Sequence, residues 1–287
     1  MPAISILIPT FDPQPDHLKA AIHSVLAQTF SDWELIIHDD ASRTDTEEIV
    51  RPFLTDPRIL FRKSPRRLGI GGNWNASIGQ ATAPLVAFLF QDDLWNPNYL
   101  KRSVEILQKN PDVGFTAANH SYRIDTKTAA SVTGIYKEVE DLRAAEMPEG
   151  RIVGEKFLKK WIERGLRPNL IGEPSFVVLR RTLIESAGPF RDDMQQGLDA
   201  EYWIRCLQKS DGWWIRESLG EFRVHSSGAS AINEQSGSGR ADRLKMFRIL
   251  IRSLPHGELR TLAKRTMRRE FLRMVQKFLS RRVRRVS

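Results

Sequence analysis

Short apolar segments alternate with amphipathic ones along the first ninety or so residues, and this alternation restricts the fold more than any other feature. Residues 4–8, 34–38 and 85–90 are short, apolar and rich in β-branched side chains, as expected of buried strands. Between the first two of these, Leu18 and Ile22 recur at helical spacing. Strands that alternate with helices require crossover connections, so the sequence predicts an α/β fold with a mainly parallel sheet flanked by helices.

Polar residues follow three of the predicted strands at the point where each strand ends. Thr10 and Asp12 follow the first strand, Asp39 and Asp40 follow the second, and the Gln-Asp-Asp sequence of residues 91–93 follows the last. Ligands of parallel sheets bind beyond the carboxyl ends of the strands. Three acidic clusters on one edge therefore indicate a binding site.

The pair Asp92 and Asp93 has two interpretations. Adjacent carboxylates repel each other unless a cation or hydrogen-bond donors lie nearby. Mg²⁺ and Mn²⁺ prefer oxygen ligands and commonly take one or two carboxylates together with substrate phosphates. The alternative is a solvated turn in which Asp93 caps the next helix. Taken alone, the pair favours the turn.

Beyond residue 97 the pattern is less regular. We expect helices around residues 100–107 and 157–162 and from Asp199, and strands at residues 113–118 and within 213–225. The polar stretch from Asp125 to Gly150 is expected to be a variable loop region. Residues 226–239 are rich in Ser and Gly and predict a loop or linker.

The composition is that of an ordinary globular protein, with 41% hydrophobic and 28% charged residues in a chain of 287. This length suits one large α/β domain or a domain with an appendage. Cys206 is the only cysteine, which excludes a disulfide framework and favours the cytosol. The apolar stretch of residues 83–90 is too short to cross a bilayer, and no signal peptide is expected.

The net charge of +9 is unevenly distributed. Residues 240–287 contain 16 Lys or Arg against three acids, a local charge of +13 that leaves −4 for the rest of the chain. Apolar residues interleave with these cations and predict basic amphipathic helices. Such helices can lie on an anionic membrane surface, or they can pack on the domain with solvated arginines. Nucleic acid is an improbable partner, because no recognised nucleic-acid-binding module accompanies the charge.

Four motifs occur in order: SILIPTFD at residues 5–12, SVLAQTF at 24–30, WELIIHDDAS at 33–42 and QDD at 91–93. This succession closely resembles the family 2 inverting glycosyltransferases, whose fold is the GT-A type. The resemblance covers roughly residues 3–228.

The resemblance implies a domain organisation. Residues 1–228 would form the catalytic domain, with a nucleotide-binding half at 1–97 and an acceptor half at 98–228. Residues 229–287 would then be the Ser/Gly linker and a basic amphipathic helical extension.

The same resemblance implies roles for individual residues. Phe11 would lie against the nucleotide base, Asp40 would accept a hydrogen bond from its imide N–H, Asp92 would meet the ribose or sugar, and Asp93 would bind the metal. A core aromatic is the alternative for Phe11. The full set expected to bind the nucleotide sugar is Pro9, Thr10, Phe11, Asp12, Asp40, Asn75 and Asp92. The sequence departs from the family pattern at Trp74, where an arginine is usual; Arg66 or Arg67 could substitute.

Asp199 matches the position of the catalytic base in the family, because it precedes Trp203 and Arg205 with the expected spacing. An inverting transfer is one in-line displacement, so one carboxylate must take the proton of the attacking hydroxyl. A helix N-cap is the alternative role for Asp199, and Glu201 is a weaker candidate for the base. His225 matches a late histidine that approaches the metal and diphosphate, although a lone histidine is often structural.

These observations predict an enzyme that moves a sugar from a UDP- or dTDP-sugar to an acceptor hydroxyl with inversion, using Mg²⁺ or Mn²⁺. The expected acceptor is a saccharide or lipid-linked sugar of cell-envelope polysaccharide or glycolipid synthesis, reached from the cytoplasm or the cytoplasmic membrane face. A nucleotidyltransferase of similar fold and a non-catalytic sugar- or membrane-binding module are the alternatives. The first usually has a glycine-rich phosphate loop after its first strand, which residues 9–12 are not.

Overall fold

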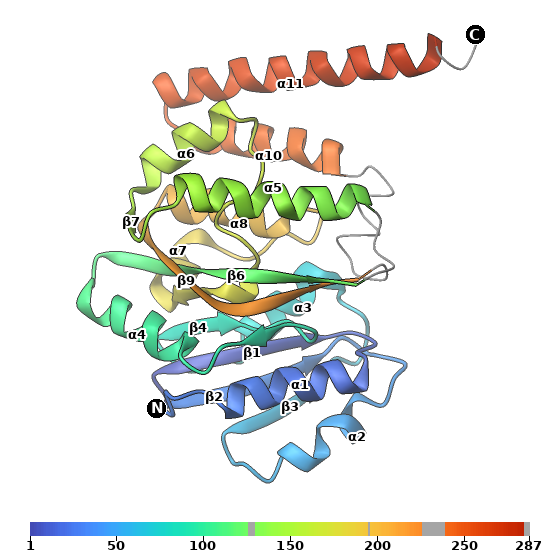
Figure 1. The fold of residues 1–287 in the computed structure, drawn as a ribbon, viewed down its shortest axis with the longest axis vertical. Helices are drawn as coiled ribbons and strands as arrows, with labels where there is room; N and C mark the ends of the chain where they lie inside the picture. Colours follow the sequence, from blue (N-terminus) through green and yellow to red (C-terminus); the bar gives the residue numbers. More distant parts are fainter. Residues whose placement is uncertain (126–129, 195, 226–238, 284–287) are drawn as a thin grey trace.

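The computed structural model describes residues 1–125, 130–194, 196–225 and 239–283 and has one mixed sheet with helices on both faces (Figure 1). Among these residues the strand order is β3-β2-β1-β4-β8-β6-β9-β5, and β7 pairs with β9. The strands are β1 (Ile4–Thr10), β2 (Trp33–Asp39), β3 (Ile59–Lys63), β4 (Leu85–Phe88), β5 (Leu94–Trp95), β6 (Val113–Ile124), β7 (Gly150–Ile152), β8 (Val177–Arg180) and β9 (Asp211–Val224).

The first four strands form the parallel half of the sheet. β1 lies between β2 and β4, runs parallel to both, and is buried along its whole length. Such burial on both faces explains why its sequence is a continuous apolar run. The polar residues that follow β1, β2 and β4 therefore meet at one edge of the sheet, as the sequence predicts.

The second half of the sheet is mixed rather than parallel. β8 enters antiparallel to both β4 and β6, while β6 and β9 pair in parallel over a long distance. The predicted α/β fold with helices around a central sheet is confirmed. The sheet differs from the predicted mainly parallel arrangement in its antiparallel pairs.

Helices cover both faces of this sheet (Figure 1). They are α1 (Pro15–Leu26), α2 (Thr46–Val50), α3 (Gly69–Ile78), α4 (Tyr99–Lys109), α5 (Ala130–Glu146), α6 (Gly154–Glu163), α7 (Arg181–Ala187), α8 (Leu198–Leu207), α10 (Gly239–Ser253) and α11 (Glu258–Val283). The 3₁₀ turns η1 (Arg51–Phe53) and η2 (Pro174–Phe176) complete the set of described helical elements.

Two expectations about local structure were wrong. The stretch between Asp125 and Gly150 contains the helix α5, whose described inward side chains include Arg143 as well as Tyr136 and Val139. A buried arginine breaks the apolar pattern by which a helix is recognised. Also, the sequence predicts a helix from about residue 73, after a glycine-rich turn at residues 69–72, whereas α3 begins within that segment at Gly69.

The C-terminal helices pack on the catalytic core. Phe247 and Leu250 of α10 and Ala263 of α11 are fully buried in the same apolar cluster as α6 and α8. In Figure 1 these two helices lie at the end of the molecule opposite α2. The predicted linker of residues 226–238 lies outside the described residues, and the domain boundary at 228 stays a prediction. None of the described helices has the length and hydropathy that crossing a bilayer requires.

We predict that Phe247→Ala lowers the free energy of unfolding by about 3–5 kcal/mol, because it leaves a cavity where a large side chain is fully buried. The neighbouring Arg248 is exposed, so Arg248→Ala should stay within about 0.5 kcal/mol. Urea unfolding of both variants measures this difference. Equal stability of the two variants would show that α10 is not part of the core.

Candidate active site

Gln91 ties the ends of β1 and β4 together. Its side-chain oxygen accepts a hydrogen bond from the backbone N–H of Phe11 at 2.9 Å, and its amide nitrogen donates to the carbonyl of Phe11 at 3.3 Å. This pair of bonds mimics a short stretch of sheet pairing. It fixes the turn of residues 91–93 beside the first strand end.

The acidic pair after β2 is structural in this conformation. Asp39 is buried and accepts hydrogen bonds from the hydroxyls of Thr10, Ser42 and Thr46. Asp40 is 2% exposed and accepts from the backbone N–H groups of Leu68 and Gly69 at 2.6 and 3.0 Å. Its charge therefore faces the positive end of the α3 dipole. The predicted contact of Asp40 with a nucleotide base stays a prediction.

The other residues near β1 that are predicted to bind the nucleotide sugar form two pairs, one buried and one partly exposed. Pro9 and Thr10 are buried in the strand. Phe11 and Asp12 are partly exposed at its end. The guanidinium of Arg67 lies over the Phe11 ring at 3.9 Å from its centre. The ring of Phe11 is thus partly exposed at the strand end, and the long side chain of Arg67 covers one of its faces. The predicted stacking of this ring on a nucleotide base stays a prediction.

Asp12 has a left-handed backbone conformation, with φ of 43°. Arg43 holds it there through its backbone N–H at 2.7 Å and its guanidinium at 2.6 and 2.9 Å. These hydrogen bonds lower the pKa of Asp12. The carboxylate is therefore ionised and fixed at the edge of the site.

Asp92 and His225 form the accessible polar pair of the last strand end. His225 Nε2 lies 2.8 Å from Asp92 Oδ2, and both side chains are about one-fifth exposed. This hydrogen bond raises the pKa of His225. The imidazole and the carboxylate lie close enough for one divalent cation to replace the shared proton.

Asp93 faces inward instead. Its side chain is fully buried, with Oδ2 accepting from the hydroxyl of Ser175 at 2.6 Å and Oδ1 from the backbone N–H of Arg223 at 3.1 Å. Burial, and then the charge of Asp92, raise the pKa of Asp93 well above its usual range. In this conformation Asp92 is the more exposed carboxylate of the pair, and the predicted metal role of Asp93 stays a prediction.

The residues present fit a divalent ion only in part. No group of three or more His, Cys, Asp or Glu side chains able to hold a metal ion occurs in the part of the chain that the structure describes. Asp92 and His225 supply one oxygen and one nitrogen donor. An ion such as Mg²⁺ commonly completes its coordination with substrate phosphates and waters, so this pair suits an ion that arrives with a diphosphate.

Asn75 and Trp74 of α3 are bound to the segment before α8. The Asn75 amide pairs with both the N–H and the carbonyl of Phe190, each at 2.8 Å. Trp74 stacks on Phe90 at 5.1 Å between ring centres and contacts Phe190 edge-on. Both residues therefore join the two halves of the domain, and the predicted donor contact of Asn75 stays a prediction.

Asp199 lies in the first turn of α8 and is partly exposed. Asn169 donates a hydrogen bond to its Oδ2 at 2.8 Å. Desolvation raises the pKa of Asp199 to about 6, and the charge of Glu173 acts in the same direction. A carboxyl group with a pKa near neutrality is suited to proton transfer.

A buried charged cluster that sequence reasoning missed lies next to this base. Glu173 Oε2 lies 2.7 Å from His120 Nε2 and 3.5 Å from Arg143 Nη2, and Tyr122 donates to the carboxylate at 3.4 Å. Burial opposes ionisation, but the interactions with His120 and Arg143 outweigh it and hold the pKa of Glu173 at about 2.

Arg143 is the permanent cation of this cluster, since burial and Arg143 itself lower the pKa of His120. Gly172 makes room for it, with φ of 104° and no space for a Cβ beside the guanidinium. Glu173 acts electrostatically on both Asp93 and Asp199. The donor-side turn and the candidate base therefore belong to one site.

One hollow of the described surface lies outside this site. It measures about 680 Å³ and lies along α11. The chemistry of the strand ends identifies the candidate active site better than the size of a hollow does.

The model of the family described as glycosyl transferase family 2 matches residues 5–181. An uncharacterized glycosyltransferase of Nostoc sp. is 30% identical over 252 residues, covering 83% of this chain and 71% of that protein. The GalNAc(5)-diNAcBac-PP-undecaprenol beta-1,3-glucosyltransferase of Campylobacter jejuni is 25% identical over 226 residues, covering 78% and 65%. The chain thus spans about two thirds of the length of these relatives.

Among solved structures, TarS 1-349 of S. aureus in complex with UDP-GlcNAc aligns with a TM-score of 0.67 at 12% identity, over 92% of this chain and 70% of that one. The mannosyltransferase PcManGT of Pyrobaculum calidifontis, in complex with GDP-Man and Mn²⁺, aligns with 0.64 at 16% identity, over 96% and 75%. These likenesses show the GT-A fold. With the family model matching more than half of its length, the chain belongs to glycosyl transferase family 2.

Proposed function

We propose that this glycosyltransferase moves a sugar from a UDP- or dTDP-sugar to a hydroxyl of a lipid-linked or cell-envelope saccharide, with inversion at the anomeric carbon. The observation that carries the proposal is the placement of Asp92 and His225 at the strand ends with Asp199 beyond Glu173. Asp92 and His225 would lie near the leaving diphosphate, and Asp199 would lie near the attacking hydroxyl.

The donor would occupy the ends of β1 and β4. Phe11 offers its ring to the base once Arg67 moves aside or shares the stack. Asp12 would meet the ribose, and Asn75 and Asp40 would shape the pocket floor from behind. Asp92 and His225 would hold a Mg²⁺ or Mn²⁺ ion, and that ion would neutralise charge on the departing diphosphate.

Asp199 would act as the general base. Its carboxylate would take the proton of the acceptor hydroxyl as the oxygen attacks the anomeric carbon, and the bond to the diphosphate would break on the opposite side. Asn169 orients the carboxylate. Glu173 would keep the base from becoming too weak, because its negative charge raises the pKa of Asp199.

The acceptor class is suggested by relatives. The Escherichia coli protein described as UDP-Glc:alpha-D-GlcNAc-diphosphoundecaprenol beta-1,3-glucosyltransferase is 32% identical over 117 residues, 41% of this chain and 45% of that protein. Its acceptor is an undecaprenol-linked sugar, as is that of the Campylobacter jejuni relative. Such acceptors would place this enzyme on the cytoplasmic face of a membrane.

Exchange of each acid in the turn for its amide tests the metal assignment. We predict that Asp92→Asn abolishes the rise in melting temperature that Mn²⁺ and UDP produce together, because an amide is a poor metal ligand. Asp93→Asn should retain this rise. Burial raises the pKa of Asp93 well above its usual range, so a neutral amide resembles the protonated group. The reverse pattern would restore Asp93 as the metal ligand.

Asp199→Asn tests the base. We expect transfer to fall by about 10²–10⁴-fold, the typical contribution of general base catalysis. Donor binding, measured as the thermal shift with a UDP-sugar, should not change. The matched control is Asp192→Asn, an exposed acid seven positions earlier, which should retain activity. Substantial transfer by Asp199→Asn would remove it from the mechanism.

The pH dependence of kcat/KM tests the same carboxyl group. Only the ionised form accepts a proton, and desolvation raises the pKa of Asp199 to about 6. We therefore expect kcat/KM to level off above about pH 6 and to fall about tenfold for each pH unit below it. Asn169→Ala removes a hydrogen bond that lowers this pKa, so the acidic limb should move to higher pH. An acidic limb unchanged by Asn169→Ala would contradict the assignment.

A further inference from the structure

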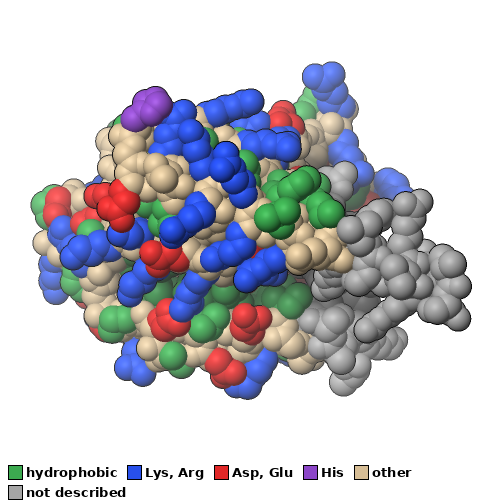
Figure 2. Space-filling model, turned by 90° about the horizontal axis from the view of Figure 1, so that it is seen from above, with side chains coloured by type: hydrophobic (Ala, Val, Ile, Leu, Met, Phe, Trp, Pro, Cys, Tyr) green, Lys and Arg blue, Asp and Glu red, His purple; other side chains and the backbone are tan. Residues whose placement is uncertain are grey.

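The outward face of α11 is both cationic and apolar. Phe271 and Leu272 are 48% and 60% exposed, high values for large apolar side chains. Lys264 and Arg268 are exposed on the same face, toward the start of the helix. Seen from above in Figure 2, Lys and Arg side chains gather around a hydrophobic patch on this side of the molecule.

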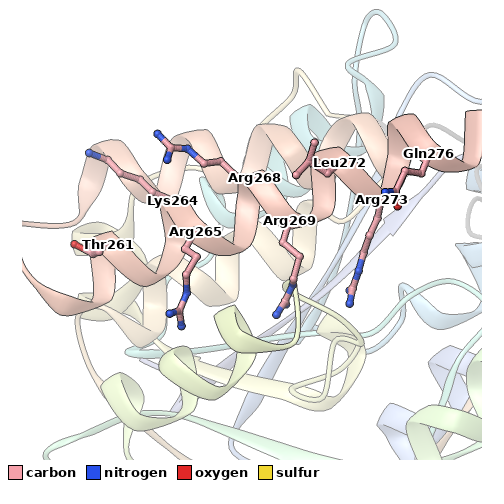
Figure 3. A pocket seen from close by; sticks show the side chains of 8 residues that line it. All are labelled: Thr261, Lys264, Arg265, Arg268, Arg269, Leu272, Arg273 and Gln276. Atoms are coloured by element: carbon pink, nitrogen blue, oxygen red, sulfur yellow. The ribbon is translucent and has the colours of Figure 1, made fainter.

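The cations of α11 fall into two sets. Arg269 donates to the carbonyl of Glu163 at 2.6 Å and so helps to attach the helix to α6. Arg273 pairs at 2.9 Å with Glu270 of α11 itself. Lys264, Arg265 and Arg268 have no ion-pair or hydrogen-bond partner among the residues that the structure describes. In Figure 3, Lys264 and Arg268 point away from the domain, while Arg265, Arg269 and Arg273 point toward it.

The opposite face of α11 is the one that packs. Leu262, Ala263 and Thr266 are buried against α6 and α10. One side of α11 is thus fully packed against the domain, and the other side remains available to a partner of opposite charge.

The helix layer is firmly connected to the candidate base. Asp242 of α10 accepts a hydrogen bond from the backbone N–H of Gln196 at 2.8 Å, and Lys245 donates to the carbonyl of Asp193 at 2.6 Å. These residues belong to the segment that leads into α8 and Asp199. α10, which packs on α11, is therefore hydrogen-bonded to the segment that precedes the candidate base.

We propose that the outward face of α11 rests on an anionic lipid surface, with Phe271 and Leu272 inserted among the headgroups and Lys264 and Arg268 paired with lipid phosphates. A helix that presents apolar residues flanked by cations is suited to this interface. The exposed leucine and phenylalanine favour lipid over nucleic acid, whose contacts are chiefly ionic. This inference rests on the proposed function, because it names the surface on which a lipid-linked acceptor would be met.

Co-sedimentation of the full chain with vesicles tests the proposal. Binding is expected to vesicles of phosphatidylcholine mixed with phosphatidylglycerol and not to phosphatidylcholine alone. A basic residue near an anionic surface contributes about 1 kcal/mol, or about fivefold in affinity. The double variant Lys264→Gln, Arg268→Gln should therefore bind about 25-fold more weakly. Phe271→Ser with Leu272→Ser should weaken the binding that persists at high salt.

The matched control removes two exposed cations elsewhere. Lys101 and Lys109 of α4 are exposed, and their exchange for Gln changes the net charge equally while leaving α11 intact. Equal losses in both double variants, equal binding to neutral vesicles, or binding of the wild type to duplex DNA but not to vesicles would each overturn the proposal. Hydrolysis of the donor sugar in solution should be the same in all variants. Its absence in the wild type would count against the proposed function and not against the surface.

Discussion

The site depends on the burial of Asp93. Its two carboxyl oxygens join three segments that are distant in sequence, since it carries the turn after β4, accepts from Ser175 before β8, and accepts from the backbone of Arg223 near the end of β9. Burying a carboxyl group destabilises the folded state unless the group is hydrogen-bonded or protonated. The turn of residues 91–93 therefore depends on the hydrogen bonds from Ser175 and Arg223. With Asp93 held inward, Asp92 is directed outward beside His225.

The remaining catalytic geometry follows from that anchor. Ser175 belongs to η2, and Glu173 lies directly before it, so the anchor also sets the position of the charged cluster with His120 and Arg143. Glu173 in turn acts on Asp199. The turn of residues 91–93 and the candidate base Asp199 are therefore positioned by one set of neighbouring polar contacts, and the apolar core beneath it holds the strands that carry them.

The sequence predicted the fold and the meeting of the acidic strand ends at one edge of the sheet, but not the contacts that each carboxylate makes there. Strands β1 and β2 were predictable because a buried parallel strand leaves a continuous apolar run. Which of Asp92 and Asp93 faces outward was not, because adjacent residues of a turn point in different directions and the choice depends on Ser175 and Arg223. The buried position of Arg143 could not be predicted from neighbouring residues either. It depends on hydrogen bonds to Tyr122 of β6 and to the carbonyl of Leu170, which are distant in sequence.

The most direct test of this account is the position of the metal. Crystals of the chain with UDP and Mn²⁺, examined by anomalous scattering at the manganese edge, would locate the ion relative to the two carboxylates. The account predicts that the anomalous peak lies within coordination distance of Asp92, His225 and the diphosphate oxygens. Asp93 should still accept its hydrogen bond from Ser175. A peak on Asp93, or one remote from His225, would contradict it.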